Sequence, residues 1–240
     1  MNPFPDFVNP LGEKLVVERF IAAARAAGTV DTLVLSTSNW APFHPTWLAE
    51  NPAYPLKDFV GSKWEAEEAL RASGFKQYTI LRPSWLVHNY ALPHAMMGYP
   101  DFAATGKLRT AMRPDQPIAH LDAYDVGKFA SAALLDPARF AGKEVTLAVG
   151  NVTLNEVGRE LSEISGKDVP VEYVPAEEFM KDPSNMFSMM RGVLGMWTTL
   201  KGNTITEEQL ALQKSFGIEL TPVRKALERY KDTLVTTTRA

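Results

Sequence analysis

The chain has 240 residues, of which 45% are hydrophobic and 22% charged, and its formal net charge is −3. A balance this close to neutral attracts neither nucleic acid nor an anionic membrane strongly, so we expect neither as a partner. The sequence has no long apolar run and no secretory signal pattern, and it lacks the cysteines that disulfides, thiolate nucleophiles and cysteine metal sites need. These features predict a cytoplasmic protein with one sizeable core, or one domain plus a smaller lobe.

The first third of the chain alternates amphipathic helices with short apolar strands. Apolar residues recur at helical spacing over 13–27, and residues 32–36 are apolar almost throughout, as in a strand buried on both faces. A second helix is predicted over 62–73 and a second buried strand over 78–81. Residues 39–57 hold four prolines and several bulky aromatics, which predicts a long irregular connection with a functional role. This alternation indicates a parallel α/β sheet.

The remainder of the chain is less regular. Residues 84–118 mix aromatics, methionines and glycines without a clear period. Asp125 is a candidate N-cap for the next helix, because its carboxylate can accept from free backbone N–H groups. The other expected elements are helices over 126–135, 153–165, 176–181, 185–200, 206–217 and 221–234, and strands over 144–149 and 169–174.

Several segments, taken in order, resemble the NmrA-like atypical short-chain dehydrogenases over residues 12–180. The strongest stretch is 63–89, where a lysine-bearing helix, a Ser-Gly turn and the strand "YTILRPSWLVHN" follow one another. The resemblance implies an α/β fold with a Rossmann-like parallel sheet. Residues 1–150 would form a partial NAD(P)-binding-type domain, and 151–240 a smaller, mostly helical lobe to which 84–118 contribute. It also implies a reductase or isomerase of a small, often aromatic, metabolite, with NADP or NAD as its cofactor.

One feature of that family is missing from the sequence. Its members open with a strand, a glycine-rich turn and a helix, which together hold the pyrophosphate. The chain contains no G-x-G-x-x-G or G-x-x-G-x-x-G, and no strand precedes Gly192 and Gly195, which we expect to be ordinary loop or helix-packing glycines. We therefore expect an amino-terminally truncated sheet and weak or absent dinucleotide binding. A bare sheet edge would also favour a homodimer or another protein partner that covers it.

Lys63 is the first candidate for chemistry. The resemblance implies that this lysine holds the nicotinamide ribose, and in typical short-chain dehydrogenases a tyrosine four residues earlier supplies the proton. Here that position is Phe59, which has no ionisable proton, so the usual acid is absent. The alternative is a solvated lysine that pairs with Glu67 at i+4.

Hydroxyl groups follow the first predicted strand. Ligands of open α/β sheets bind beyond the carboxyl ends of the strands, so Ser36 and Thr37 are cofactor-binding candidates and Ser38 is a catalytic one. The alternative is a Ser/Thr turn that bonds its own backbone.

More candidates follow the second strand. By resemblance, the turn of Pro83, Ser84 and Trp85 lies against the nicotinamide, although Trp85 could equally be a core residue or a lid contact. His88 is a candidate acid or base because an imidazole titrates near neutrality, and the alternative is a structural histidine. No spacing of His, Asp or Glu matches a metal site. The polar and aromatic residues expected to bind a small-molecule substrate are Trp40, Tyr54, Asn89 and Tyr90.

Three functional hypotheses remain open. The first is an NAD(P)-dependent oxidoreductase, inactive if the missing phosphate loop is essential. The second is a regulatory protein that senses the dinucleotide without turnover, which Phe59 favours. The third is a protein that kept the fold, lost the cofactor and uses its pocket differently.

Overall fold

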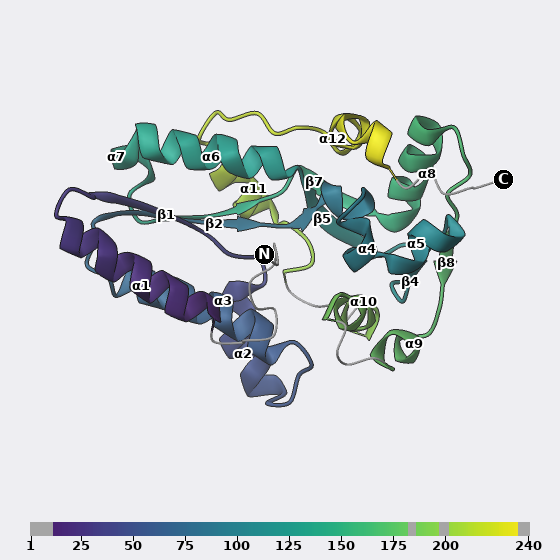
Figure 1. Ribbon diagram of the computed structural model, residues 1–240, viewed down its shortest axis with the longest axis horizontal. Helices are drawn as coiled ribbons and strands as arrows, with labels where there is room; N and C mark the ends of the chain where they lie inside the picture. The colour runs from purple at the N-terminus through teal and green to yellow at the C-terminus, as the bar shows by residue number, and fades with distance from the viewer. Residues whose placement is uncertain (1–11, 182–185, 197–201, 235–240) are drawn as a thin grey trace. The chain divides into compact units, whose positions relative to one another are not determined.

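The computed structural model describes residues 12–181, 186–196 and 202–234 (Figure 1). The chain divides into two compact units, which are described separately. Unit 1 comprises Met1–Pro83, Val126–Leu147 and Glu208–Ile218, and unit 2 comprises Ser84–Asp125, Ala148–Glu207 and Glu219–Ala240. No helix in the described ranges is long and apolar enough to cross a membrane.

Unit 1 is built on a three-stranded parallel sheet. Its elements are α1 (Gly12–Ala27), β1 (Thr32–Ser36), η1 (Ala41–Phe43), α2 (His44–Glu50), α3 (Lys57–Arg71), β2 (Gln77–Pro83), most of α6 (Ala123–Leu135), α7 (Pro137–Phe140), β6 (Lys143–Leu147) and most of α11 (Glu207–Lys214). The strand order is β1-β2-β6, with Leu33 paired with Tyr78 and Ile80 with Glu144. Helices α1 and α3 lie along one side of the sheet and α6 and α7 along the other (Figure 1).

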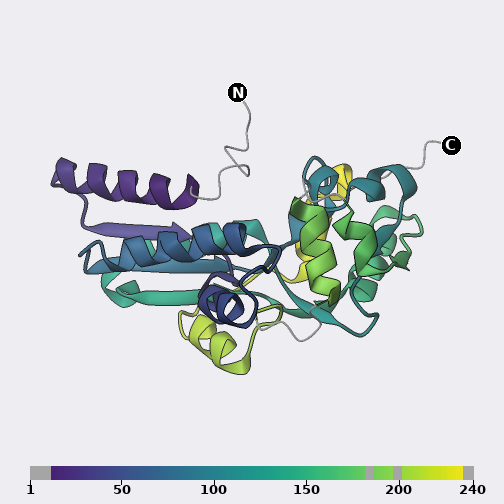
Figure 2. The same ribbon diagram turned by 90° about the horizontal axis from the view of Figure 1, so that it is seen from below.

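The apolar faces of α1 and α3 form one core with the sheet. Ile21 and Ala24 of α1 pack with Leu33 of β1, Leu70 of α3 and Ile80 of β2. Figure 2 shows α1 and α3 running alongside the strands of this sheet. Burial of these side chains from water is the main term that holds the two helices on the sheet.

An aromatic cluster forms the core on the other side of the sheet. Phe140 of α7 stacks on Phe216, with ring centroids 4.3 Å apart, and Phe129 of α6 meets Phe216 edge-on at 6.0 Å. The Thr79 hydroxyl of β2 donates to the Phe140 carbonyl at 3.1 Å, so α7 is tied to the central strand.

Unit 2 contains two small sheets and several short helices. The three-stranded sheet has the order β3-β5-β7, and β4 pairs with β8 in parallel. The elements are β3 (Trp85–Leu86), η2 (Val87–Tyr90), α4 (Ala95–Gly98), α5 (Pro100–Thr105), β4 (Leu108–Thr110), β5 (Pro117–Leu121), β7 (Gly150–Thr153), α8 (Leu154–Ser165), β8 (Val171–Tyr173), α9 (Ala176–Met180), α10 (Met186–Met196), α12 (Val223–Arg229) and η3 (Lys231–Thr233).

Two expectations about local structure need correction. The segment 39–57 is not irregular throughout, because η1 and α2 occupy much of it. Helix α6 begins before Asp125, and it is the Asp122 carboxylate that accepts from the backbone N–H of Tyr124, at 3.1 Å. Asp125 instead binds the backbone N–H and the hydroxyl of Thr221.

Candidate functional site

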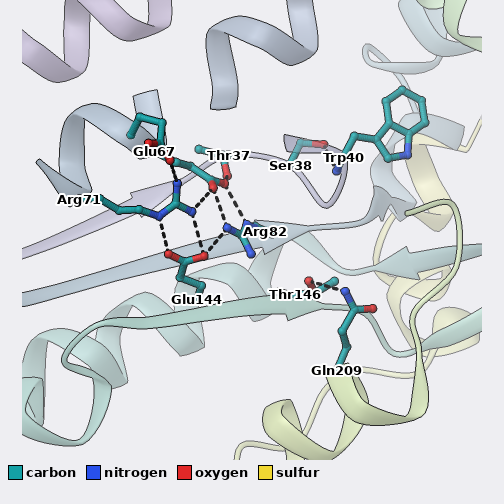
Figure 3. A network of polar contacts seen from close by, with 10 residues as sticks. Thr37, Ser38, Trp40, Glu67, Arg71, Arg82, Glu144, Thr146 and Gln209 are labelled. Carbon is teal, nitrogen blue, oxygen red and sulfur yellow. Dashed lines mark hydrogen bonds and ion pairs between the residues drawn. The ribbon is translucent and has the colours of Figure 1, made fainter. Parts of the chain in front are cut away.

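Polar side chains gather between α3 and the sheet of unit 1, from Glu144 near the start of β6 to Arg82 and Thr37 at the carboxyl ends of β2 and β1 (Figure 3). The centre of this cluster is the Glu67 carboxylate of α3, which is fully buried. It accepts from the Thr37 hydroxyl at 2.7 Å and from Arg82 Nε and Nη2 at 2.9 and 2.6 Å. Arg82 stands on β2 in the same alternation as Ile80, so its side chain lies on the side of the sheet that α3 covers.

Arg71 and Glu144 complete this network. Arg71 Nη2 donates to Glu67 at 2.8 Å, and Arg71 Nε donates to Glu144 Oε1 at 2.6 Å. Arg82 Nη2 reaches Glu144 Oε2 as well, at 2.5 Å. Two guanidinium groups and two carboxylates therefore bridge α3, β2 and β6, as the dashed lines of Figure 3 show.

The electrostatics of the network follow from this pairing. Burial opposes ionisation of Arg82, but its hydrogen bonds and attraction to Glu67 outweigh that cost and raise the pKa of Arg82. Burial likewise opposes ionisation of Glu144, but hydrogen bonds from Arg71 and the nearby guanidinium charges lower its pKa. Because the donors of both arginines point at protein carboxylates, this network is suited to fixing α3 on the sheet.

The three hydroxyl candidates after β1 have different surroundings. Ser36 is exposed, whereas Thr37 is buried against Glu67. The Ser38 hydroxyl accepts from the backbone N–H of Trp40 at 3.2 Å, as expected of a Ser/Thr turn. The roles assigned to these residues from the sequence stay predictions.

Lys63 lies on α3 one helical turn before Glu67, toward the carboxyl end of the sheet. Its Nζ donates to Glu13 of α1 at 2.6 Å and lies 4.8 Å from the centroid of the Phe59 ring. The i+4 pair with Glu67, the alternative to a ribose-binding role, is not formed, because Glu67 turns toward Arg71 and Arg82. The lysine therefore has an acidic partner and an aromatic ring beside it, but no ionisable hydroxyl at position 59.

Pro83, Ser84 and Trp85 form the connection from β2 into β3. Pro83 ends β2, and its carbonyl accepts from the backbone N–H of Asn39 at 3.2 Å. The Ser84 hydroxyl is buried and has no hydrogen-bond partner among the described residues. A buried hydroxyl without a partner is unusual in proteins and is consistent with a ligand contact.

His88, Asn89 and Tyr90 lie together in η2 of unit 2. Burial, and then the nearby His94 imidazole, lower the pKa of His88 to about 4, so the ring is neutral near pH 7. Asn89 is half-buried. Tyr90 is fully buried, and its hydroxyl lies 2.9 Å from His120 Nε2. A neutral His88 is a poor general acid near pH 7.

Trp40 and Tyr54 are both buried in unit 1, where the aromatic residues of 39–57 pack on one another. The Tyr54 hydroxyl lies 2.5 Å from His44 Nδ1, and burial lowers the pKa of His44. Beside His44 is a hollow of about 420 Å³, a size in the range of small-molecule sites. Its lining residues come from α2, α3 and the loop between them: His44, Leu48, Pro52, Lys57, Asp58, Gly61, Ser62 and Glu65.

The described residues do not fit a nicotinamide dinucleotide through the usual glycine turn. Five described strands lead into helical structure, namely β1, β3, β5, β7 and β8, and none of these strand–helix links contains a glycine. After β5 the linking residue is Asp122, whose carboxylate would repel a pyrophosphate at the start of α6. Gly192 and Gly195 lie within helix α10, as the absence of a preceding strand predicted.

The chain was compared with known proteins. A family model described as the NmrA-like family matches residues 14–231. The chain belongs to the NmrA-like family. Comparison with curated protein sequences gives no match.

Solved structures share the fold of this NmrA-like chain at low identity. A nucleoside-diphosphate-sugar epimerase from Staphylococcus aureus is 19% identical, with a TM-score of 0.65 over 94% of this chain and 74% of that one. A Citrobacter sp. triphenylmethane reductase complexed with NADP(H) is 21% identical, with a TM-score of 0.66 over 95% and 74%. NmrA, a negative transcriptional regulator, in complex with NAD is 18% identical, with a TM-score of 0.65 over 90% and 69%. The α/β fold with a Rossmann-like parallel sheet is thus confirmed.

Sequence reasoning missed the ionic network of unit 1 and the contact between His44 and Tyr54. One signal was present, because Arg82 is a charged residue inside an otherwise apolar strand and such a residue needs a buried partner. The identity of that partner depends on how α3 lies on the sheet, which the sequence pattern does not specify.

Proposed function

We propose that this chain is a small-molecule-binding member of the NmrA-like family that performs no tyrosine–lysine reductase chemistry. The observation that carries the proposal is the environment of Lys63. Its ammonium group is bound to Glu13 and lies beside the Phe59 ring, where a reductase of the usual kind needs a hydroxyl that can give up a proton. The absence of a glycine turn in the described strand–helix links points the same way.

The hollow beside His44 is the binding site that this proposal favours. It has the volume of a small organic molecule, and charged groups of both signs lie around it, in Lys57, Asp58 and Glu65. The Glu65 Oε2 atom lies 3.5 Å from Lys14 Nζ of α1 and accepts no hydrogen bond from the described residues, so this carboxylate has capacity left to accept from a ligand. A polar molecule with both donors and acceptors suits this lining.

A second candidate function is an NAD(P)-dependent oxidoreductase. It is favoured by the likeness to the triphenylmethane reductase structure complexed with NADP(H), and by the unpartnered Ser84 hydroxyl in the turn that follows β2. In that case NADP(H) would supply the hydride, and Lys63 and the hydroxyls after β1, all in unit 1, would orient the ribose and nicotinamide.

A turnover assay separates the two candidates. NADPH consumption is measured with enone, quinone and triphenylmethane dye acceptors for the wild type, Lys63→Met and Lys76→Met. Lys76 is an exposed lysine between α3 and β2 and serves as the matched control. We expect the three proteins to show the same background rate. A rate that falls more than tenfold in Lys63→Met, but not in Lys76→Met, would contradict the proposal and favour the oxidoreductase.

Ligand binding in the hollow is tested by ligand-observed NMR with a library of polar metabolites. Glu65→Trp fills the hollow from its rim, whereas Glu68→Trp places the same ring on the exposed side of α3. We expect binders of the wild type to be lost in Glu65→Trp and kept in Glu68→Trp. Ligands that still bind both variants would show that the binding site is not this hollow.

A further inference from the structure

Helix α10 of unit 2 is packed closely enough to bury an arginine. A Cβ atom added to Gly192 would lie 2.7 Å from Met180 Sδ, and one added to Gly195 would lie 2.5 Å from the Ala111 carbonyl oxygen. The two glycines therefore allow α10 to rest directly on α9 and on the residue that follows β4. This packing brings Arg191 into the interior, where only 3% of its surface is exposed.

The Arg191 guanidinium lies close to two aromatic rings. Its guanidinium carbon is 4.4 Å from the centroid of the Phe179 ring and 5.6 Å from that of Tyr99. Neither Nε nor Nη1 has a hydrogen-bond partner among the residues that the structure describes. Asp101 Oδ2 lies 3.9 Å from Nη1, which is too far for a hydrogen bond. Burial lowers the pKa of Arg191, as expected for a cation removed from water with little compensation.

Among the residues that the structure describes, the charges around Arg191 do not balance its own. Arg109 lies 3.3 Å from Asp101 and 3.5 Å from Glu172, and Lys107 lies 3.4 Å from Glu172. These two cations match the two carboxylates, so Arg191 shares Asp101 with Arg109 and adds one positive charge that no carboxylate of this described group balances. A buried guanidinium in this state is costly, and removing a charge from water normally requires a paired anion.

We propose that Arg191 binds the carboxylate of a small monocarboxylic acid with an aromatic body. One negative charge suits the one unmatched positive charge, whereas a dianion such as phosphate would bring a second negative charge that no cation in this group compensates. The ring of Trp85 meets that of Tyr99 edge-on at 6.1 Å, so aromatic side chains extend from Arg191 through Tyr99 to Trp85. A buried water molecule could accept from one of the free N–H groups, but it brings no charge. These residues are distinct from Lys63 and from the lining of the hollow, so the inference does not depend on the proposed function.

The test is thermal unfolding of the full chain with benzoate as the probe, at constant ionic strength. Benzyl alcohol is the uncharged match, and inorganic phosphate is the dianionic comparison. We expect benzoate to raise the Tm of the wild type in a saturable way and the other two compounds to leave it unchanged. We expect Arg191→Met to lose the benzoate response and to unfold, without ligand, at or above the wild-type Tm, because it removes an uncompensated buried charge.

Arg113→Met is the matched control, since Arg113 is an exposed arginine that pairs with Asp115, and it should respond to benzoate as the wild type does. If Arg191→Met fails to fold, Arg191→Lys keeps the charge but loses the planar donor group, and benzoate affinity should fall about 10- to 100-fold. A benzoate response that persists unchanged in Arg191→Met or Arg191→Lys overturns the proposal. So does an equal response of the wild type to benzyl alcohol or to phosphate.

Discussion

A fully buried carboxylate at the end of the sheet determines how α3 is fixed on unit 1. Glu67 receives hydrogen bonds from Thr37, Arg71 and Arg82. Removing two guanidinium groups from water in one buried site is costly. The Glu67 carboxylate, which pairs with both, offsets that cost. The network is therefore a set of mutually dependent groups, and the loss of its central member leaves cations without compensation.

Glu67→Ala is predicted to lower the free energy of unfolding by about 3–5 kcal/mol, as expected when one partner of a buried ion pair is removed. Glu68→Ala, one residue along α3, removes an exposed carboxylate that also pairs with Arg71 and should cost less than about 1 kcal/mol. Urea denaturation of both variants measures the difference. Similar losses in the two variants would mean that the network does not stabilise the fold.

His120 gives unit 2 a defined sensitivity to acid. The ring is fully buried, its Nε2 lies 2.9 Å from the Tyr90 hydroxyl, and burial lowers its pKa from 6.5 to about 4. Below pH 6.5 the unfolded chain takes up a proton that the folded chain does not accept until about pH 4. Folding stability is thus fully present above pH 6.5 and falls as the pH is lowered through this window.

Between pH 6.5 and 4 this linkage should remove about 3 kcal/mol of the free energy of unfolding, at about 1.4 kcal/mol per unit of pKa shift. We predict that His120→Gln abolishes that part of the pH dependence, whatever its stability at neutral pH. Chemical denaturation of the wild type and of the variant at several pH values gives the slope of the free energy of unfolding against pH for each protein. Equal slopes for the wild type and the variant would contradict the account.

At the scale of elements, glycines in helices have two opposite roles. Gly195 lets α10 touch Ala111, whereas a Cβ at Gly127 in α6 would meet no atom within 4 Å. Gly195→Ala should therefore destabilise the protein by about 1–3 kcal/mol through overpacking. Gly127→Ala should stabilise it by about 0.5–1 kcal/mol, because alanine is the better helix former. Thermal unfolding of both variants tests the pair, and shifts of the same sign would refute it.

The elements that the sequence predicts well are those with local end signals. Gly28 has a φ of 66° directly after α1, and Thr153 forms a capping box with Glu156 at the start of α8, as such residues indicate. Helix α2 was missed because Pro45 looks like a helix breaker, although proline is well tolerated in a first turn. Local chemistry thus predicts the boundaries of the long elements but not those of the short ones.

The site was less predictable than the fold because its contacts join distant parts of the chain. Helical spacing indicates Glu67 as an alternative partner of Lys63, yet the actual partner is Glu13, 50 residues away. Nothing in the local pattern distinguishes the buried Arg191 from the exposed Arg113. The family resemblance did indicate which segment carries the lysine, since it rests on the order of whole elements.

At the scale of the molecule, unit 1 presents an apolar surface on α1 next to an edge strand. Val16 and Phe20, one helical turn apart, are 65% and 63% exposed. In the described residues β1 pairs with β2 alone, so its other side offers free backbone groups. We predict that a second copy of the chain covers this surface.

Light scattering of the purified chain should then show a dimer. Combined Val16→Glu and Phe20→Glu should yield a monomer, while Leu135→Glu, at an 83% exposed apolar residue of α6, should leave the dimer intact. A wild-type chain that stays monomeric at high concentration contradicts the prediction.

Calorimetric titration of the chain with NADPH is the most direct test of the central claim, that this NmrA-like protein works without the dinucleotide chemistry of a reductase. A glycine turn and helix N-terminus would supply several charge-assisted hydrogen bonds, each worth about 1.5–3 kcal/mol. Without two or three of them, affinity should fall by about two to six orders of magnitude. We predict a millimolar or weaker Kd, unchanged in Lys63→Met. A low micromolar Kd that weakens in Lys63→Met would contradict the account and establish Lys63 as part of a working cofactor site.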